Sequence, residues 1–399
     1  MNFLNAVAAL SLLLLAMSCQ EQRKLPTLPI VDVASAQAGV RQAIEPAYAA
    51  AKARPDDAAV VKRLGMLLHA HSQVAAAAIA YQRAAALEPG EADTSYYLGT
   101  VLAATGSYKD AIAPLRISLR SREAVAVRLR LADTLFEDGK VAEARLEYET
   151  LITADHSLAP AYFGLGRCLS GSESVLMLER AVQLFPRYGA ARFALATAYR
   201  QLGQQSKASA ALDNYERDKL QVPPIDDPAM AAIQALDASA TGLLRASFAM
   251  ERQGQLGQAA ALQERAVAAD PTLTQAWVNL IALYARLDQA PKAEMAYRKA
   301  IALEPNNVEA LYNFGTFCAQ VSRFDEARKA FETAVAVDPG NANALDSLGA
   351  IVEQEGAWDR AVALYSARSS GRSKTLLSAL SPWSELCQSA ALRRGHSTI

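Results

Sequence analysis

The four histidines are the side chains best suited to acid–base or metal chemistry, and their spacing argues against both. His69 and His71 are two residues apart, so on a helix they point to different faces and cannot hold one metal ion, unlike histidines four apart. No G-x-x-x-x-G-K, H-E-x-x-H, G-x-S-x-G or C-x-x-C-H motif occurs. We therefore expect a protein that is not an enzyme and that has no metal and no other cofactor.

Cys19 follows an apolar run that suggests export. Residues 3–17 are mostly apolar, too short for a membrane span of about 20 residues but suited to a secretory signal. Ala16 and Ser18 are small residues that suit cleavage before Cys19, and the arrangement resembles a bacterial lipoprotein signal. The resemblance implies lipidation of Cys19 and a protein of the cell envelope that faces the periplasm. The alternatives are ordinary signal cleavage at the same bond and an uncleaved anchor, which also imply export.

The elements that position the remaining chemistry are repeats. Prolines and alanines recur every 34 residues, at Pro271, Pro305 and Pro339 and at Ala259, Ala293, Ala327 and Ala361. Within each interval the apolar residues are three and four apart, as on a helix with one buried face. The proline ends the second helix of each interval because it has no N–H. The pattern predicts stacked helical hairpins rather than one compact core.

This pattern resembles the tetratricopeptide repeat family and extends over nine units, with small residues at positions 8, 20 and 27 where helices pack closely. The resemblance implies an all-α, right-handed superhelical solenoid of about nine helix-turn-helix repeats in two arms. The fourth unit is about four residues short, most simply between its helices. Arg128 and Arg192 replace the usual aromatic residue at position 4 of units three and five, so we expect different packing there.

The breaks in the pattern predict the domain limits. Pro223, Pro224 and Pro228 exclude a helix at the centre of the chain, and Ala229 to Leu236 can form only a short one. The predicted parts are a signal peptide (1–18), a tether (19–36), an N-terminal capping helix (37–57), a first repeat arm (58–222), a proline-rich elbow with a short helix (223–239), a second repeat arm (240–369), and a C-terminal capping helix and tail (370–399).

In this family the first helix of each hairpin lines a concave groove, which positions 5 and 9 of the repeat commonly face. The predicted partner-binding residues are Lys62, Met66, Tyr96, Leu129, Phe136, Phe163, Arg167, Phe193, Phe248 and Tyr312. Their aromatic and apolar character favours an extended peptide or an amphipathic helix as the ligand. The alternative is that the aromatic rings pack on the neighbouring repeat. The residues with which some family members bind acidic tails of cytosolic chaperones are absent, since Met66 follows Lys62 where an asparagine is needed.

Composition narrows the partners further. With 40 basic and 41 acidic residues among 399, the chain has no overall charge to attract nucleic acid, and we expect membrane association only through the lipid anchor. We therefore predict a scaffold or adaptor that binds other proteins or peptides in the cell envelope. The alternative is an accessory subunit that positions a periplasmic enzyme or electron-transfer partner.

Overall fold

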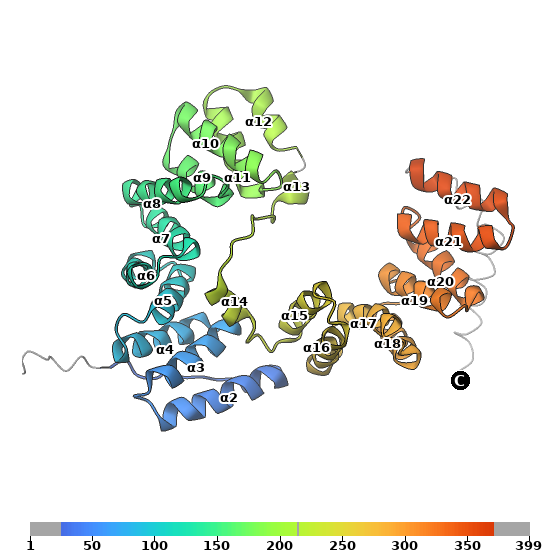
Figure 1. Cartoon of the computed structure of the whole chain (residues 1–399), viewed down its shortest axis with the longest axis horizontal. Helices are drawn as coiled ribbons and strands as arrows, with labels where there is room; N and C mark the ends of the chain where they lie inside the picture. The colour runs from blue at the N-terminus through green and yellow to red at the C-terminus, as the bar shows by residue number, and fades with distance from the viewer. Residues whose placement is uncertain (1–24, 214, 371–399) are drawn as a thin grey trace, which may run out of the picture. The chain divides into compact units, whose positions relative to one another are not determined.

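The computed structural model describes residues 25–213 and 215–370, and these form α-helices joined by turns and loops. The chain divides into two compact units (Figure 1). Unit 1 contains the residues up to Ala36 together with Val40–Asp237, and unit 2 contains Gln37–Gly39 together with the residues from Ala238 onward. The predicted all-α class is confirmed. Cys19, residues 1–18 and residues 371–399 of the predicted C-terminal cap lie outside the described residues.

Unit 1 contains a leading helix, five hairpins and two short helices. Its helices are α2 (Ala38–Ala53), α3 (Ala58–Ala70), α4 (Val74–Leu87), α5 (Ala92–Ala104), α6 (Tyr108–Ser121), α7 (Val125–Glu137), α8 (Val141–Ala154), α9 (Ala159–Cys168), α10 (Gly171–Leu184), α11 (Gly189–Gln201), α12 (Gln205–Ala211), α13 (Tyr215–Asp218) and α14 (Pro228–Gln234). The hairpins α3–α4 to α11–α12 are repeats 1 to 5. The two helices of each hairpin pack on each other, and the second helices of repeats 1 to 4 pack on the first helix of the following repeat.

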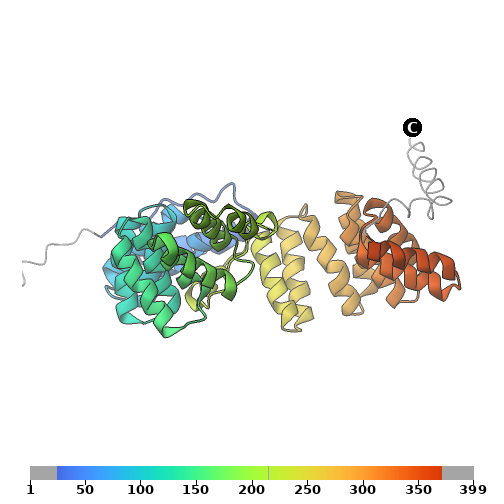
Figure 2. The same ribbon diagram turned by 90° about the horizontal axis from the view of Figure 1, so that it is seen from above.

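Unit 2 contains four hairpins, repeats 6 to 9, which stack in sequence (Figure 2). Its helices are α15 (Ala240–Arg252), α16 (Leu256–Ala269), α17 (Thr274–Arg286), α18 (Ala290–Leu303), α19 (Val308–Gln320), α20 (Phe324–Val337), α21 (Ala342–Gln354) and α22 (Trp358–Ser370). Asn307 and Asn341 begin α19 and α21 by accepting hydrogen bonds from the backbone N–H groups of Ala310 and Ala344.

Glycine at position 8 lets the two helices of a hairpin approach closely. A Cβ atom on Gly65 would lie 2.7 Å from the ring of Tyr81, and one on Gly315 would lie 2.6 Å from the ring of Phe331. Both rings are fully buried. The repeating glycine thus makes room for a large side chain of the second helix in the core, whereas the pattern predicted a close approach with no side chain between the helices.

Two kinds of side chain at position 4 donate the same hydrogen bond, to the carbonyl oxygen of the proline six residues earlier. The indole N–H of Trp277 donates to the carbonyl oxygen of Pro271 at 3.0 Å, and the guanidinium Nε of Arg192 donates to that of Pro186 at 2.7 Å. Arg128 instead forms ion pairs with Glu123, just before α7, and with Glu147 on α8. The arginines are therefore accommodated by polar contacts to backbone or carboxylate oxygens.

Repeats 4 and 5 depart from the regular hairpin. Helix α9 has 10 residues, whereas α3, α5, α7 and α11 have 13 each. The shortening of the fourth unit, predicted between its helices, therefore lies mainly in the first helix. Helix α12 has only 7 residues where the other second helices of unit 1 have 14. The regular stack of unit 1 therefore ends at this point.

The residues that precede the repeats pack on unit 1. The predicted tether (19–36) includes Pro26, whose carbonyl oxygen accepts a hydrogen bond of 2.6 Å from Arg83, and Val33, which is buried. Residues 25–33 thus lie against the first repeat instead of extending freely. Ile44 and Ala51 of α2 are also fully buried, which gives this helix the covering role expected of a terminal cap.

Candidate functional site

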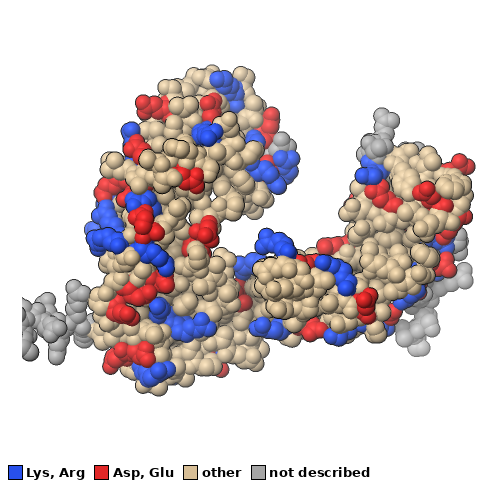
Figure 3. Space-filling view, in the orientation of Figure 1, with Lys and Arg blue, Asp and Glu red and all other residues tan. Residues whose placement is uncertain are grey.

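The predicted site residues lie on the first helices of the hairpins. We call the face that carries positions 5 and 9 of these helices the groove of each unit. Unit 1 holds eight of the ten residues, and unit 2 holds Phe248 and Tyr312. Both signs of charge are mixed on the surface that Figure 3 shows, so neither unit presents a large patch of one sign there.

The beginning of the groove of unit 1 is covered by the chain itself. After α13 the chain runs along the inner side of the repeats to α14, which packs against α3 (Figure 1). Tyr96, at position 5 of repeat 2, is 1% exposed. Lys62 and Met66 on α3 are half-buried, and Lys62 forms an ion pair with Glu91 at 3.3 Å. The predicted elbow therefore packs on the first arm as well as leading to the second.

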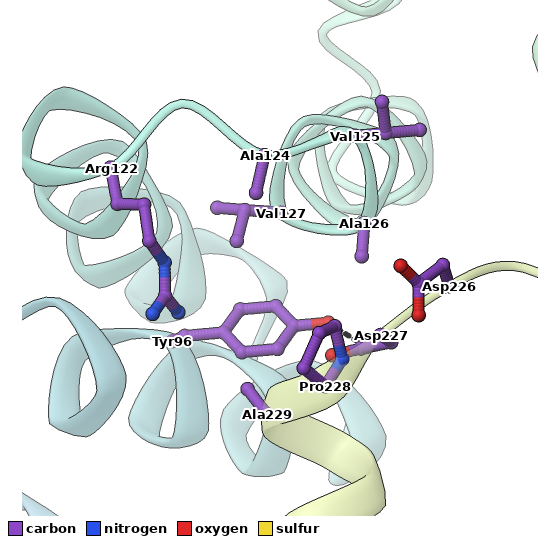
Figure 4. Close-up of a pocket in the computed structure, with 10 residues that line it drawn as sticks. All are labelled: Tyr96, Arg122, Ala124, Val125, Ala126, Val127, Asp226, Asp227, Pro228 and Ala229. Atoms are coloured by element: carbon purple, nitrogen blue, oxygen red, sulfur yellow. Dashed lines mark hydrogen bonds between the residues drawn. The ribbon is translucent and has the colours of Figure 1, made fainter.

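Tyr96 and Asp227 make the central contact. The Tyr96 hydroxyl donates to Asp227 Oδ2 at 2.5 Å, as Figure 4 shows. The other oxygen, Oδ1, accepts from the backbone N–H of Met230 at 3.0 Å and so begins α14. Burial raises the pKa of Tyr96, the hydrogen bond to Asp227 raises it further, and Arg130 opposes both. The tyrosine therefore stays a neutral donor at physiological pH.

The rest of α14 is held by apolar contacts and by a histidine. Ala229 and Ile233 belong to the hydrophobic core of the first repeats, and Ile233 is 2% exposed. The Tyr97 hydroxyl donates to the carbonyl oxygen of Ala229 at 3.3 Å. Beyond the helix, Asp237 Oδ1 lies 3.6 Å from Nδ1 of His71, with both side chains largely covered. Burial lowers the pKa of His71, although Asp237 opposes this.

The middle of the groove of unit 1 contains an arginine between aromatic rings. The Arg167 guanidinium lies 3.9 Å from the ring centre of Phe136 and 5.4 Å from that of Phe163, which is a cation–π arrangement. Glu137 accepts a hydrogen bond of 2.5 Å from Arg167. Leu129 is half-buried nearer the start of the groove. Phe163 also packs on Tyr188, with ring centres 5.0 Å apart, so this phenylalanine contributes to packing.

Two predicted residues are open to solvent. Phe193 in repeat 5 is 49% exposed and touches the ring of Tyr215, with 5.8 Å between centres. Phe248 in repeat 6 is 43% exposed. Both occupy the first helix of their hairpin, where a partner could cover them.

The groove of unit 2 contains a cavity of about 240 Å³ between repeats 8 and 9. Tyr312 and Thr316 of α19 line one side, and Ser347, Ala350 and Gln354 of α21 line the other. No charged side chain lines it. The cavity is smaller than the roughly 300–1,000 Å³ of most small-molecule sites and suits a single apolar or amide side chain of a peptide.

Two further features were sought in the described part of the chain, a metal-binding cluster and a membrane-spanning helix. Within residues 25–213 and 215–370, no group of three His, Cys, Asp or Glu side chains is placed to hold a metal ion. None of the helices in those ranges has the length and apolarity needed to cross a bilayer.

Asp227, Ile233 and Asp237 are the contacts that the repeat pattern missed. Aligning the repeats identifies positions that recur in each unit. Asp227, Ile233 and Asp237 have no counterparts in other units, because they lie in the segment that interrupts the 34-residue period. Their signal was the order Asp227-Pro228 followed by apolar residues at Ala229, Ile233 and Leu236, which is the start of an amphipathic helix.

Comparisons with known proteins match parts of both units. Two models described as "Tetratricopeptide repeat" match, one at residues 70–126, 96–160 and 319–371 and the other at 296–329. No curated protein matches the chain.

Several solved structures are similar at low identity. MamA from residue 41 onward, from Desulfovibrio magneticus RS-1, is 19% identical over 41% of this chain and 97% of its own, with a TM-score of 0.38. The TPR domain of P58(IPK) is 16% identical over 82% and 96%, with a TM-score of 0.28. The first TPR of Spaghetti (RPAP3), bound to an HSP90 peptide, is 24% identical over 29% and 93%, with a TM-score of 0.28.

Proposed function

We propose that this chain is a tetratricopeptide repeat protein that serves as a scaffold for protein–protein interaction. In this proposal it binds a peptide or helix of another protein along the grooves of its two units. Affinity would come from several apolar anchors spread over successive repeats rather than from one deep pocket. The protein would act without catalysis of its own.

The observation that carries this proposal is the exposure of Phe193 and Phe248. At position 5, which Phe193 occupies, Tyr96 is 1% exposed under α14 and Val278 is fully buried, and the other position-5 side chains are half-buried. Phe248 occupies position 9, where Thr100 is 6% exposed. A phenylalanine that keeps almost half of its surface in water forgoes much of the free energy that burial supplies. Large aromatic side chains in such positions are typical anchors for a partner.

The cavity of unit 2 supports the same function. It lies between first helices of adjacent repeats, and its uncharged lining includes the hydroxyls of Thr316 and Ser347 and the amide of Gln354. These groups can hydrogen-bond a peptide while Tyr312 packs against its side chain. An extended segment that places one side chain here would run along the predicted groove.

Site-specific photo-cross-linking tests the proposal. A photoreactive phenylalanine analogue at position 193 or 248 of the full chain should cross-link to one defined partner in membrane extracts of the source cells. Leu176 on α10 and Val362 on α22 are 58% and 63% exposed and lie on second helices, so the analogue there should give no such product. Equal cross-linking at all four positions would contradict a groove-specific partner.

A second experiment distinguishes a role of Phe193 and Phe248 in partner binding from a role in the stability of the fold. Phe193→Ser and Phe248→Ser should each weaken binding of the cross-linked partner at least tenfold, because each removes an apolar anchor. The far-ultraviolet circular dichroism should not change. Lost helicity would instead assign the rings to the core.

The cellular location is a further part of the proposal. The apolar run before Cys19 supports a lipid anchor in the bacterial envelope, with the repeats facing the periplasm. Cys19→Ala should abolish incorporation of labelled palmitate and release the protein from the membrane fraction. Unchanged fractionation would favour an uncleaved anchor.

A further inference from the structure

Residues 226–237 occupy the groove of unit 1 in the manner of a bound ligand. An extended stretch precedes the segment, which then forms the one short helix α14 and packs on the first helices of repeats 1 and 2. This is how a helical peptide binds a groove formed by other helices. The segment belongs to none of the repeats, so its contacts do not continue the stack.

The contacts between residues 226–237 and the first repeats are polar at the ends of the segment and apolar in its middle. The segment has three carboxylates, Asp226, Asp227 and Asp237, and no basic residue. The surface that receives it supplies the Tyr96 hydroxyl and His71, with Arg130 close enough to lower the pKa of Tyr96. Asp227 at the start of the segment thus accepts from a hydroxyl group, Asp237 at its end lies beside the imidazole of His71, and the apolar side chains between them meet the core.

The segment fills its site incompletely. A cavity of about 350 Å³ remains between Asp226–Ala229 and the start of α7, with Tyr96 and Arg122 on its walls (Figure 4). Arg122, Val125 and Asp226 on its walls are exposed, so the cavity opens to solvent and a larger side chain can enter it. A helix with a larger side chain at this place would make contacts that α14 lacks.

The segment is also held by few groups. Helix α14 has 7 residues, too few to be stable alone, and its outer residues Ala231, Ala232, Gln234 and Ala235 are exposed. Val222, in the stretch that leads to it, is 67% exposed. Such a segment opens at a smaller free energy than the hairpins on which it lies.

From these observations we propose that residues 226–237 are a displaceable ligand of the groove of repeats 1 to 3, and that the partner displacing them is an acidic amphipathic helix of another protein. This partner has a carboxylate before its first turn, as Asp227 is, and apolar residues four apart, as Ala229 and Ile233 are. A bulkier side chain beside α7 gives it the advantage. The inference rests on the proposed function, because it names the partner class of one of the two grooves.

The test is binding of a synthetic peptide in trans. A fluorescent peptide of residues 224–238 is titrated into the full chain and followed by anisotropy. If the chain's own segment occupies the groove about 90% of the time or more, the apparent affinity is at least tenfold below that of the free groove. Ile233→Asp in the full chain should release the segment and raise the affinity for the peptide at least tenfold.

Matched variants make the result specific. Ala232→Asp adds the same charge at the neighbouring exposed position and should bind the peptide as the unaltered chain does. A peptide with Asp227→Ala loses the carboxylate that begins the helix and accepts from Tyr96, and should bind the released groove at least fivefold more weakly. Equal affinity of the Ile233→Asp and unaltered chains, or equal binding of both peptides, would overturn the inference.

Hydrogen exchange on the unaltered chain covers the case in which Ile233→Asp does not fold. The amides of residues 230–235 should exchange at least a hundredfold faster than those of α3 and α5, and exchange at one common rate would show that α14 is a fixed part of the fold. A failure of the peptide to bind leaves the cross-linking at Phe193 and Phe248 as a separate test of the proposed function.

Discussion

Units 1 and 2 are built from the same hairpin but end differently. In unit 2 the first helices α15, α17, α19 and α21 all have 13 residues, and the 34-residue period continues through the unit. In unit 1 the period weakens at α9 and stops at α12, after which the chain turns back over its own first repeats. Within the described residues, regular repeats thus accompany a groove that no other segment covers, and the loss of regularity accompanies a groove whose beginning the chain covers.

The two units differ in what covers the groove side of their hairpins. Within the stack each hairpin is covered by the next, which is why position-equivalent leucines such as Leu64 and Leu280 are both buried. On the groove side no neighbour follows. Unit 1 places α14 there, whereas unit 2 leaves Phe248 and the cavity beside Tyr312 accessible.

The largest expected effect tests whether the two units unfold separately. Leu280→Ala removes a core side chain and should lower the free energy of unfolding of unit 2 by about 2–5 kcal/mol. Leu64→Ala should do the same in unit 1. Trp277 and Trp358 lie in unit 2, and residues 1–237 contain no tryptophan. Urea unfolding followed by tryptophan fluorescence therefore reports unit 2, while circular dichroism reports both units.

Leu280→Ala should therefore move the fluorescence transition to lower urea, and Leu64→Ala should move only a transition seen by circular dichroism. An equal shift of the fluorescence transition by Leu64→Ala would mean that the two units unfold as one body, and the comparison between them would lose its basis.

A smaller effect separates the units by pH. Burial, with Arg130 nearby, lowers the pKa of His69 to about 4, whereas an unfolded histidine titrates near 6.5. Between these values the unfolded chain binds a proton that the folded chain does not, so unit 1 loses stability as the pH falls. We expect a loss of about 1–2 kcal/mol between pH 7 and 5, reduced by screening at the part of the side chain that touches water.

Unit 2 has no histidine within residues 240–370, so its fluorescence transition should move much less over the same range. His69→Gln should make the pH profile of unit 1 shallower and leave the part that comes from His71, whose pKa burial also lowers, while His156→Gln, at an exposed position, should not change the profile. A profile unchanged by His69→Gln would assign the acid sensitivity to other groups.

The smallest effect concerns one hydroxyl. Tyr96→Phe removes the hydrogen bond to Asp227 and should destabilise the docking of α14 by about 1 kcal/mol, so the amides of residues 230–235 should exchange about five times faster. Tyr312 occupies position 5 in unit 2, and Tyr312→Phe is the matched control that should leave those amides unchanged. No change for Tyr96→Phe would show that apolar contacts alone hold α14.

The hairpins were predictable because their determinants are local and repeat. Proline ends the second helix, and glycine at position 8 admits a ring such as that of Phe331. The exact position of the shortening in repeat 4 was not predictable, because either a turn or a helix end can lose residues while the apolar spacing survives. The sequence likewise did not show that Arg192 and Trp277 play the same role. What they share is a side-chain N–H that donates to the carbonyl oxygen of a proline, and not the size of a ring.

The candidate site was only partly readable for a different reason. Position counting identified Tyr96 as a groove residue, but its partner Asp227 is 131 residues away and lies in a segment without period. Nothing local distinguishes a proline-rich link that spans two arms from one that first packs on a distant helix. The ten predicted groove residues remain a prediction, of which Phe193 and Phe248 have the exposure that binding requires.

The chain between Gln221 and Asp227 has a mechanical consequence. The carbonyl oxygen of Gln221 accepts from the backbone N–H of Gly189 at the start of α11, and Asp227 is held by Tyr96 on α5. Six peptide steps reach at most about 21 Å, so while both ends are held, these two points on repeats 2 and 5 cannot separate beyond that distance. Stretching unit 1 beyond this limit therefore requires Asp227 to detach from Tyr96 first.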